Sequence, residues 1–319
     1  MHNFCKFDKI NLFQVKLILQ IKFYNLDFNY FSLLILQKSF MNNLLIDRQK
    51  IELPDHQNKM IISGWGKDVF DNSFVEKITY LSDGLKIKGY LAYPVDNSKK
   101  YPCIIWNRGG SGDKGAIDKF TARGIFGQIA SWGYIVFASQ YRGNAGSEGE
   151  EQLGGDDVND ILNLIPLADE IPAADKSSWG IEGWSRGGMM TYLTLLRNPN
   201  FKCAVLSGAI SNLKKYADEN NDKIIFYNNL FKDKNLKAEL EKRSIINFVD
   251  KLPKIPFLLM HGKNDKTVSP DQTIEMANRM DKLKIPHELI LFEGGDHFLK
   301  NHRKEVDRLR KEWFNKYLK

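Results

Sequence analysis

The sequence predicts an α/β fold built on a mostly parallel sheet with helices on both faces. From about Phe74 onward, short apolar runs of strand length alternate with segments in which apolar residues recur every three or four positions. Repeated alternation of this kind is typical of parallel strands that are buried between two layers of helices. With 319 residues, of which 43% are hydrophobic, the chain can bury a core of the required size.

The individual elements follow from these patterns in chain order. Strands at 77–80 and 85–91 flank the turn at 82–84 and form a hairpin. Six further strands, which complete an eight-stranded type of sheet, are expected at 103–107, 134–138, 178–182, 203–206, 256–260 and 287–292. Helices are expected around Phe126 and Ile129, at 158–165, 189–196 and 276–283, and at the C-terminus, where Val306, Leu309, Trp313 and Tyr317 face inward.

One segment interrupts the alternation. Residues 209–250 are rich in asparagine and lysine and contain irregular helical patches, which predicts a small cap over the carboxyl edge of the sheet. We therefore expect an α/β domain at 74–319 that carries the cap insertion 209–250, preceded by an N-terminal segment at 41–73.

The first forty residues differ in composition from the rest. Residues 1–40 contain no glycine, alanine or proline. Their longest uncharged span, 28–37, is too short to cross a bilayer, and no small-residue cleavage site follows an apolar core, so we expect a cytoplasmic protein. Three interpretations of this extension are open: an amphipathic surface attachment, a packed extension, or translated upstream sequence with Met41 as the true start. We favour the third.

Charge and cysteine content exclude several function classes. The net charge of +7 is scattered, and its densest basic stretch, at 300–319, is interleaved with acidic residues like the solvated face of a helix. A nucleic-acid partner is therefore not expected. Cys5, Cys103 and Cys203 have neither metal-ligand nor C-x-x-C spacing, so we expect no metal and no organic cofactor. The oligomeric state is left open by these features.

A Gly-x-Ser-x-Gly motif is the strongest functional signal in the chain. The hexapeptide 183–188 reads Gly-Trp-Ser-Arg-Gly-Gly and lies between the expected strand at 178–182 and the expected helix at 189–196. A sharp strand-to-helix turn holds a serine hydroxyl away from the backbone, and flanking glycines leave room for that turn. The motif therefore predicts Ser185 as a nucleophile. The same turn puts the amide of Arg186 at the start of the helix, where it can stabilise an oxyanion.

A serine nucleophile needs a base, and the base needs an acid that orients it. Asp265 follows the expected strand at 256–260, and His297 follows the one at 287–292. The order Ser, Asp, His is that of α/β-hydrolases, and the carboxyl ends of parallel strands meet at one edge of the sheet. We therefore expect Ser185, Asp265 and His297 to form a catalytic triad.

Three other residues compete for the roles of acid and base. Asp296 is adjacent in sequence to His297, and a neighbouring carboxylate rarely points at the ring beside it. His261 precedes the acid in the chain, and His302 begins a surface helix. We favour Asp265 and His297 for these reasons.

The glycine-rich loop at 108–115 allows two interpretations. Its glycines at 110, 112 and 115 fit G-x-G-x-x-G, the dinucleotide-binding pattern. That pattern also requires an acidic residue at the end of the next strand, where 139–142 reads Ser-Gln-Tyr-Arg. We favour the other interpretation, in which the backbone approaches a substrate carbonyl closely. The amide of Gly109 or Gly110 is then the second oxyanion donor.

Other charged and aromatic residues near these motifs have two interpretations each. Arg142 could contact a substrate, but an ion pair with Asp156 or Asp157 below the site is favoured. Glu151 falls in an acidic stretch that we expect to be a solvated loop. Trp184 is expected to pack in the core, although its position beside the nucleophile also suits the wall of an acyl pocket.

The motifs around these residues resemble the catalytic domain of the prolyl oligopeptidase family, in particular bacterial proteins related to dipeptidyl aminopeptidases and acylaminoacyl-peptidases. The resemblance lies in 183–188, in 260–265 (Met-His-Gly-Lys-Asn-Asp), in 294–297 (Gly-Gly-Asp-His) and in 243–247, and it extends from about Phe74 to the C-terminus. It implies an α/β-hydrolase fold and the same triad.

Two departures from the family leave peptide specificity open. Full-length family peptidases carry a β-propeller, which the roughly 70 upstream residues cannot build, since one blade takes ~40 residues or more. The family's His-Gly-Gly-Pro loop reads Arg108-Gly109-Gly110-Ser111 here.

The expected function is therefore that of a serine hydrolase. It cleaves an ester, amide or peptide bond of a small molecule or short peptide through an acyl-enzyme intermediate. Two alternatives are kept, a carboxylesterase without peptidase activity and a catalytically silent binding protein with a hydrolase fold. The intact triad argues against the second alternative.

Overall fold

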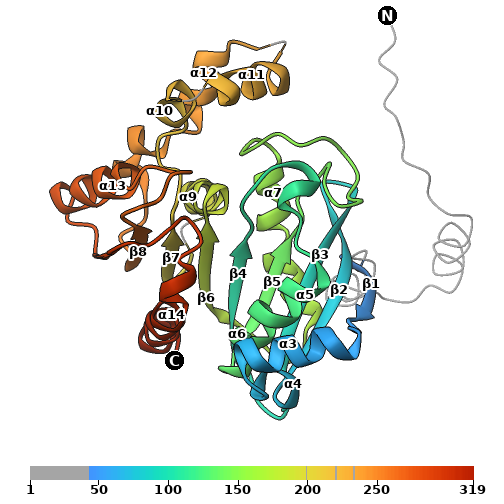
Figure 1. The fold of residues 1–319 in the computed structure, drawn as a ribbon. Helices are drawn as coiled ribbons and strands as arrows, with labels where there is room; N and C mark the ends of the chain where they lie inside the picture. Colours follow the sequence, from blue (N-terminus) through green and yellow to red (C-terminus); the bar gives the residue numbers. More distant parts are fainter. Residues whose placement is uncertain (1–42, 199, 220, 233) are drawn as a thin grey trace, which may run out of the picture. The chain divides into compact units, whose positions relative to one another are not determined.

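A nine-stranded sheet organises the part of the chain that the computed structural model describes, residues 43–198, 200–219, 221–232 and 234–319 (Figure 1). The strands are β1 (Leu45–Lys50), β2 (Ser73–Ser82), β3 (Leu85–Pro94), β4 (Tyr101–Asn107), β5 (Ile135–Ser139), β6 (Ala174–Trp184), β7 (Cys203–Ser207), β8 (Phe257–Gly262) and β9 (His287–Phe292). Their order is β1-β2-β3-β5-β4-β6-β7-β8-β9. β1, β2, β3 and β5 pair antiparallel in turn, and all other pairs are parallel.

The eight strands expected from the sequence are β2 to β9. The predicted hairpin is β2–β3, and it closes at the pair Ser82 and Leu85. The prediction missed β1, because its sequence Leu-Ile-Asp-Arg-Gln-Lys lacks the apolar alternation of a half-buried strand. β1 is an edge strand whose last five residues are exposed, and charges on such a strand oppose pairing with another chain.

Residues before position 74 take part in the same fold as those after it. Besides β1, they form α3 (Asp55–Trp65) and α4 (Asp68–Asp71), and 44–319 make up one compact unit. The boundary expected between 41–73 and 74–319 therefore does not separate two packed units in the described residues. The extension at 1–40 and the start at Met41 lie outside the described residues.

Helices cover both faces of the sheet, as predicted. The other α-helices of the described residues are α5 (Lys119–Thr121), α6 (Gly127–Ser131), α7 (Asp157–Leu162), α8 (Leu164–Leu167), α9 (Arg186–Arg197), α10 (Leu213–Asp218), α11 (Asn221–Leu230), α12 (Leu236–Lys242), α13 (Asp271–Lys282) and α14 (Arg303–Leu318). Apolar residues of α7, α8, α9 and α13 join one buried cluster, and those of α6 and α14 join another. Successive residues of β4 alternate between the clusters, since Ile105 belongs to the first and Ile104 to the second. No helix in this described part is long and apolar enough to cross a membrane.

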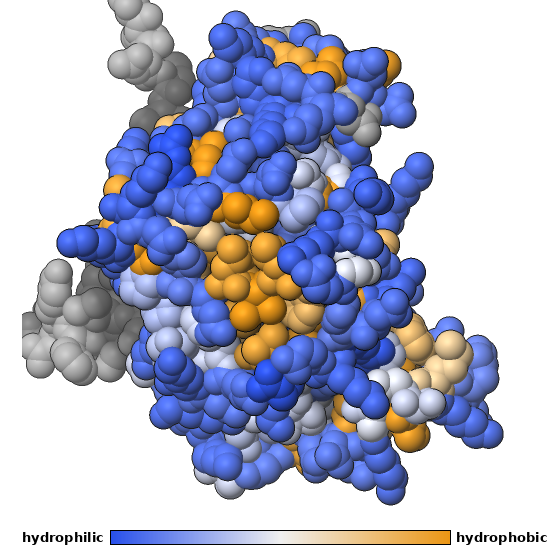
Figure 2. Space-filling view, turned by 60° about the vertical axis from the view of Figure 1, so that its left-hand side comes forward, coloured by the Kyte–Doolittle hydropathy of each residue, from blue (hydrophilic) through white to orange (hydrophobic). Residues whose placement is uncertain are grey.

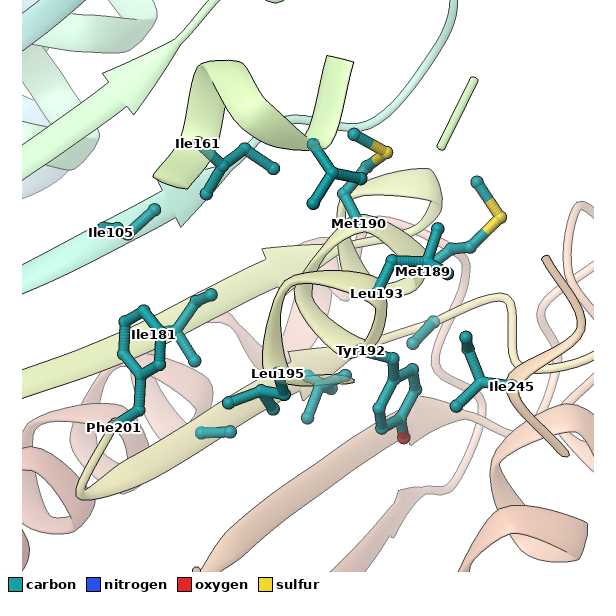
Figure 3. Packing of buried hydrophobic residues seen from close by; sticks show 14 of the residues in the cluster. Ile105, Ile161, Ile181, Met189, Met190, Tyr192, Leu193, Leu195, Phe201 and Ile245 are labelled. Carbon is teal, nitrogen blue, oxygen red and sulfur yellow. The ribbon is translucent and has the colours of Figure 1, made fainter. Parts of the chain in front are cut away.

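α9 is the most deeply packed helix near the expected site. Every residue from Arg186 to Leu195 is buried. Figure 3 shows α9 surrounded by side chains from β4, β6 and the cap segment, among them Ile105, Ile181 and Ile245. Because close packing on all sides leaves little freedom to the helix, the turn before α9 is held in a fixed position.

The segment expected to form a cap, 209–250, contains α10, α11 and α12. In Figure 1 these helices lie beyond α9 and α13, on the side toward which β7 and β8 run. Arg243 connects the segment to the loop after β5, because its guanidinium donates to the carbonyls of Leu153 and Gln152 at 2.7 and 3.1 Å.

The opposite edge of the sheet is more apolar than β1. β9 is the edge strand there, and its residues Leu289, Ile290 and Leu291 are half-buried. Figure 2, which turns that side of the protein toward the viewer, shows an apolar patch surrounded by hydrophilic residues.

Candidate active site

Ser185 occupies a strained turn between β6 and α9. Its φ of 58° and ψ of −124° are sparsely populated for a residue with a side chain. Backbone hydrogen bonds hold the turn from both sides: the amide of Ser185 donates to the carbonyl of Ser207 on β7 at 2.9 Å, and the amide of Gly188 donates to the carbonyl of Ser185 at 3.0 Å. The turn therefore presents the hydroxyl at the carboxyl edge of the sheet.

The glycines of the hexapeptide make this turn possible by allowing close backbone approach. A Cβ on Gly187 would lie 2.7 Å from the carbonyl carbon of Asn107 at the end of β4. A Cβ on Gly188 would lie 2.9 Å from the Cα of Ala209. Real side chains are not tolerated at such distances, so glycine is needed at 187 for α9 to start this close to β4 and at 188 for it to start this close to the segment after β7.

Ser185, His297 and Asp265 lie in one chain of hydrogen bonds. His297 Nε2 is 3.0 Å from Ser185 Oγ, and His297 Nδ1 is 2.6 Å from Asp265 Oδ2. Asp265 comes from the loop after β8 and His297 from the loop after β9, as the sequence predicts. All three side chains are buried, with residue exposures of 6 to 8%. The structure thus brings together three residues from separate loops, with 112 positions between Ser185 and His297 and 32 between Asp265 and His297.

Asp265 is ionised and rigidly held. Burial alone would raise the pKa of this carboxyl group, but hydrogen bonds from His261, His297 and the amide of Val268 outweigh it and keep the pKa well below its usual range. Oδ1 accepts from the amides of Thr267 and Val268 at 2.8 and 2.9 Å. The carboxylate can therefore fix the orientation of the His297 ring over a wide range of pH.

The glycine loop expected to supply an oxyanion donor lies directly against the serine. A Cβ on Gly109 would be 3.2 Å from Ser185 Cβ. Gly110 has a φ of 66°, and its carbonyl accepts from Arg186 Nη1 at 2.9 Å. Among the described residues, the amides of Gly109 and Gly110 have no hydrogen-bond partner, so both are free to bind a negatively charged oxygen.

Comparison with known proteins identifies the family to which this arrangement belongs. The profile of the prolyl oligopeptidase family matches residues 123–319. The chain is 31% identical over 237 residues to a protein named uncharacterized peptidase YtmA of Bacillus subtilis, and the match covers 73% of this chain and 90% of that protein. The chain belongs to the prolyl oligopeptidase family.

Other relatives in the family are much longer than this chain. It is 26% identical over 230 residues to a probable dipeptidyl-aminopeptidase B of Arthroderma benhamiae, and the match covers 69% of this chain and 25% of that protein. An acylaminoacyl peptidase of Pyrococcus horikoshii superposes with a TM-score of 0.68 at 25% identity, over 82% of this chain and 44% of that one. The predicted α/β-hydrolase fold is confirmed, and the chain is a serine hydrolase.

Within this prolyl oligopeptidase site, the side chain of Arg186 connects the serine turn to the glycine loop. Its guanidinium contacts the carbonyl of Gly110, the carboxylate of Glu151 and Asp157 Oδ2, the last at 3.0 Å, and lies over the ring of Tyr141. The side chain is almost fully buried, and two acidic partners compensate its charge. Arg186 therefore holds the loop that carries the amides of Gly109 and Gly110.

Two expectations about charged residues near the site need correction. Glu151 was expected in a solvated loop, but it pairs with Arg186 and accepts from the amide of Gly112 at 3.1 Å. Arg142 forms a structural ion pair, as favoured, but with Asp160 and Asp83 rather than with its expected partners. Arg142 and Glu151 both lie in the loop after β5, and the path of this loop brings them to their partners. The loop has no regular pattern in the sequence, so these pairs could not be predicted.

The three rivals for acid and base do not contact Ser185. Asp296 accepts from the amides of Phe298 and Lys300 at 3.2 Å, which is the role of a turn residue. His302 lies 2.9 Å from the carbonyl of Glu293 through Nε2. His261 does lie in the site, but its ring contacts Asp265 and not the serine.

The geometry of the glycine loop does not favour dinucleotide binding. In that type of site a helix begins directly at the glycines, so that its N-terminus faces the phosphates. Here the loop folds back on itself in a 3-10 turn at Gly112–Gly115, and a Cβ on Gly115 would lie 2.8 Å from the carbonyl carbon of Gly110. The next helix, α5, begins only at Lys119 and has three residues. Among the described residues no three histidine, cysteine, aspartate or glutamate side chains gather as metal ligands would.

Two aromatic side chains flank His297. The ring centroid of the half-buried Trp184 lies 5.0 Å from that of His297, and Trp184 Nε1 donates to the His297 carbonyl at 3.0 Å. Phe298 lies 5.1 Å from Trp184 and is 59% exposed. The sequence indicated a site role for Trp184 as one alternative, but Phe298 was missed, although it directly follows the expected base.

Proposed function

We propose that this serine hydrolase cleaves amide bonds of short peptides, and the corresponding esters, through an acyl-enzyme on Ser185. The observation that carries the proposal is the hydrogen-bond chain from Ser185 Oγ to His297 Nε2 at 3.0 Å and from His297 Nδ1 to Asp265 Oδ2 at 2.6 Å. An alcohol becomes a useful nucleophile when an oriented imidazole takes its proton, and this chain supplies the orientation.

The proposed reaction has two half-reactions. Because Nδ1–H donates to ionised Asp265, the lone pair of His297 Nε2 faces the serine hydroxyl and accepts its proton as Oγ attacks the acyl carbon. The amide of Arg186, with that of Gly109 or Gly110, donates to the oxyanion of the tetrahedral intermediate. The imidazolium then protonates the leaving amine or alcohol. In the second half, a water molecule gives its proton to His297, attacks the acyl-enzyme and releases the acid, and the proton returns to Ser185.

Peptide-like substrates are favoured because of the relatives. The similar proteins include one named as a peptidase, one named as a dipeptidyl-aminopeptidase and one named as an acylaminoacyl peptidase. The chain spans 90% of the first but only 25 and 44% of the other two, so their substrates support the proposal at the level of the bond that is cleaved.

A substrate panel separates this proposal from the carboxylesterase alternative. The panel pairs p-nitrophenyl esters with p-nitroanilides of the same aminoacyl and N-acyl-peptide groups, and it is run on the wild type and on Ser185→Ala. We expect the wild type to hydrolyse both members of at least one pair. Hydrolysis of the esters alone, at any enzyme concentration, would instead identify a carboxylesterase.

Phe298 is expected to select the leaving group. His297 must stand beside the leaving group in order to protonate it, so we expect the exposed Phe298 ring next to His297 to face the leaving side of the cleaved bond. Phe298→Ala is therefore expected to lower kcat/KM about tenfold for a peptide that releases phenylalaninamide. A loss of this size is what the removal of one aromatic contact with the substrate would cause.

The control is a substrate with the same acyl group that releases glycinamide, for which kcat/KM should stay within about twofold of the wild type. Phe298→Leu should restore part of the loss with phenylalaninamide, since it keeps an apolar surface. An equal loss for both leaving groups would show that Phe298 supports the His297 loop rather than binding the leaving group.

A further inference from the structure

His261 is a second histidine in contact with Asp265, and the proposed reaction does not use it. It lies at the end of β8, four residues before Asp265, and its side chain has no exposed surface. Its Nε2 is 3.1 Å from Asp265 Oδ2, the same oxygen that accepts from His297 Nδ1. One carboxylate oxygen is therefore shared by two imidazole rings.

The neighbours of His261 assign its tautomer. Nε2 faces Asp265 Oδ2 at 3.1 Å and the carbonyl of Val268 at 3.0 Å, and both oxygens only accept hydrogen bonds. Nε2 must therefore carry the proton. Nδ1 is 2.6 Å from the hydroxyl of Thr273 on α13, which donates to it. A neutral ring with its proton on Nε2 satisfies all these contacts.

We propose that His261 is a positioning residue of the active site. Through Nε2–H it fixes the carboxylate of Asp265 and withdraws part of that carboxylate's negative charge, and this sets the pH at which His297 takes up a proton and stops acting as the base. Thr273 holds the ring in place. The proposal rests on the proposed function, because it concerns how the base of that reaction is controlled.

Two imidazole rings compete for Asp265 Oδ2, and this competition gives the direction in which His261 shifts the pH at which His297 is protonated. Each hydrogen bond that Asp265 Oδ2 accepts reduces the electron density that it offers to another donor. With the bond from His261 in place, Asp265 stabilises protonated His297 less than it otherwise would. If that bond is removed, protonated His297 gains stability and the base is lost at a higher pH. The low pKa of Asp265 agrees with this arrangement, since four hydrogen bonds support its charge.

Other charged groups around the pair are exposed or engaged elsewhere. They are Lys263 paired with Glu293, Lys266 and Asp271 on the surface, Asp296 bonded to backbone amides, Glu275 on α13 paired with Lys215 on α10, and Arg186 on α9 paired with Glu151 and Asp157. Among the described residues, Ser185 is the remaining polar side chain that is hydrogen-bonded to the ring of His297. Apart from the two histidines, the described contacts of Asp265 are the backbone amides of Thr267 and Val268, and a side-chain substitution at His261 leaves both of these donors in place.

The test compares pH profiles of kcat/KM for full-length variants on one p-nitrophenyl ester. His261→Leu removes the donor, and His261→Gln keeps an N–H at nearly the same place. We expect His261→Leu to lose about tenfold or more in kcat/KM at the plateau, the order of one hydrogen bond to a charged group. The acid limb of its pH profile, the range in which kcat/KM falls as the pH is lowered, should also move to higher pH by roughly half a unit or more. His261→Gln should keep the wild-type limb and lose about threefold or less.

Thr273→Val is the second variant, because a leucine at 261 could prevent folding. Valine keeps the shape of threonine but removes the hydroxyl that holds His261 Nδ1, so the acid limb should move in the same direction by a smaller amount. An acid limb unchanged from the wild type in folded His261→Leu, or in Thr273→Val if the first variant does not fold, overturns the proposal. A role in stability alone would lower the melting temperature without moving the limb. Activity that persists in Ser185→Ala would instead refute the proposed function, so the two failures are distinguishable.

Discussion

Ser185→Ala is expected to lower kcat/KM by about 10⁴- to 10⁶-fold, the loss seen when the nucleophile of a serine hydrolase triad is removed. The reason is structural: no other hydroxyl in the described residues lies within hydrogen-bond distance of His297 Nε2. The fold should survive, because the substitution removes one oxygen and keeps the Cβ that the strained turn already accommodates. Initial rates on an ester and on an amide measure the loss of activity, and a circular dichroism spectrum of each protein tests whether the fold is retained.

Ser177→Ala provides the matched control. Ser177 lies on the same strand, β6, but near its start, where the residue is exposed. Its replacement should leave kcat/KM within about twofold of the wild type. If Ser185→Ala, folded and free of wild-type enzyme, kept more than about one hundredth of the activity, Ser185 would not be the nucleophile.

Arg310→Met is expected to reduce the free energy of unfolding by about 3–5 kcal/mol, the cost of leaving one member of a buried ion pair alone. Arg310 lies on α14, and its Nη2 donates to Glu182 Oε2 at 2.9 Å while Nε donates to Oε1. Glu182 stands on β6, three residues before Ser185, and both side chains are less than a tenth exposed. Without Arg310, the Glu182 carboxylate loses both of these contacts in the interior. Urea denaturation measures the change.

The double variant Glu182→Leu/Arg310→Met is the control for this ion pair. Replacing both partners by apolar residues removes the uncompensated charge, so most of the lost stability should return. If the double variant were as unstable as the sum of its two single variants, the ion pair would contribute packing rather than charge compensation. A stability of Arg310→Met within 1 kcal/mol of the wild type would contradict the assignment of a buried, coupled pair.

The parts of the site that could be predicted from the sequence are those with a local signature. Ser185 lies in a hexapeptide whose glycines are required by the turn itself, and Asp265 and His297 each directly follow an apolar strand. Chain order and parallel pairing then place all three at one edge of the sheet. Local pattern was sufficient because the fold turns each of these strand ends toward the same edge.

The parts that could not be predicted depend on contacts between distant segments. Glu151 has the composition of a solvated loop, and only the path of the chain after β5 brings it to Arg186. His261 was considered as a base, whereas its actual neighbours, Val268 and Thr273, are seen only when α13 packs beside β8. β1 carries no alternation of apolar residues and is defined by its pairing with β2 alone.

The most direct test of the account is to locate the covalent adduct of a fluorophosphonate probe by mass spectrometry of proteolytic peptides. We expect one adduct, on Ser185, and much slower formation of this adduct in His297→Ala, because the hydroxyl is activated only through the hydrogen bond from Oγ to His297 Nε2. An adduct on a different residue of the active wild-type protein, or equal labelling rates with and without His297, would contradict the central claim that Ser185, activated by His297, attacks the acyl group.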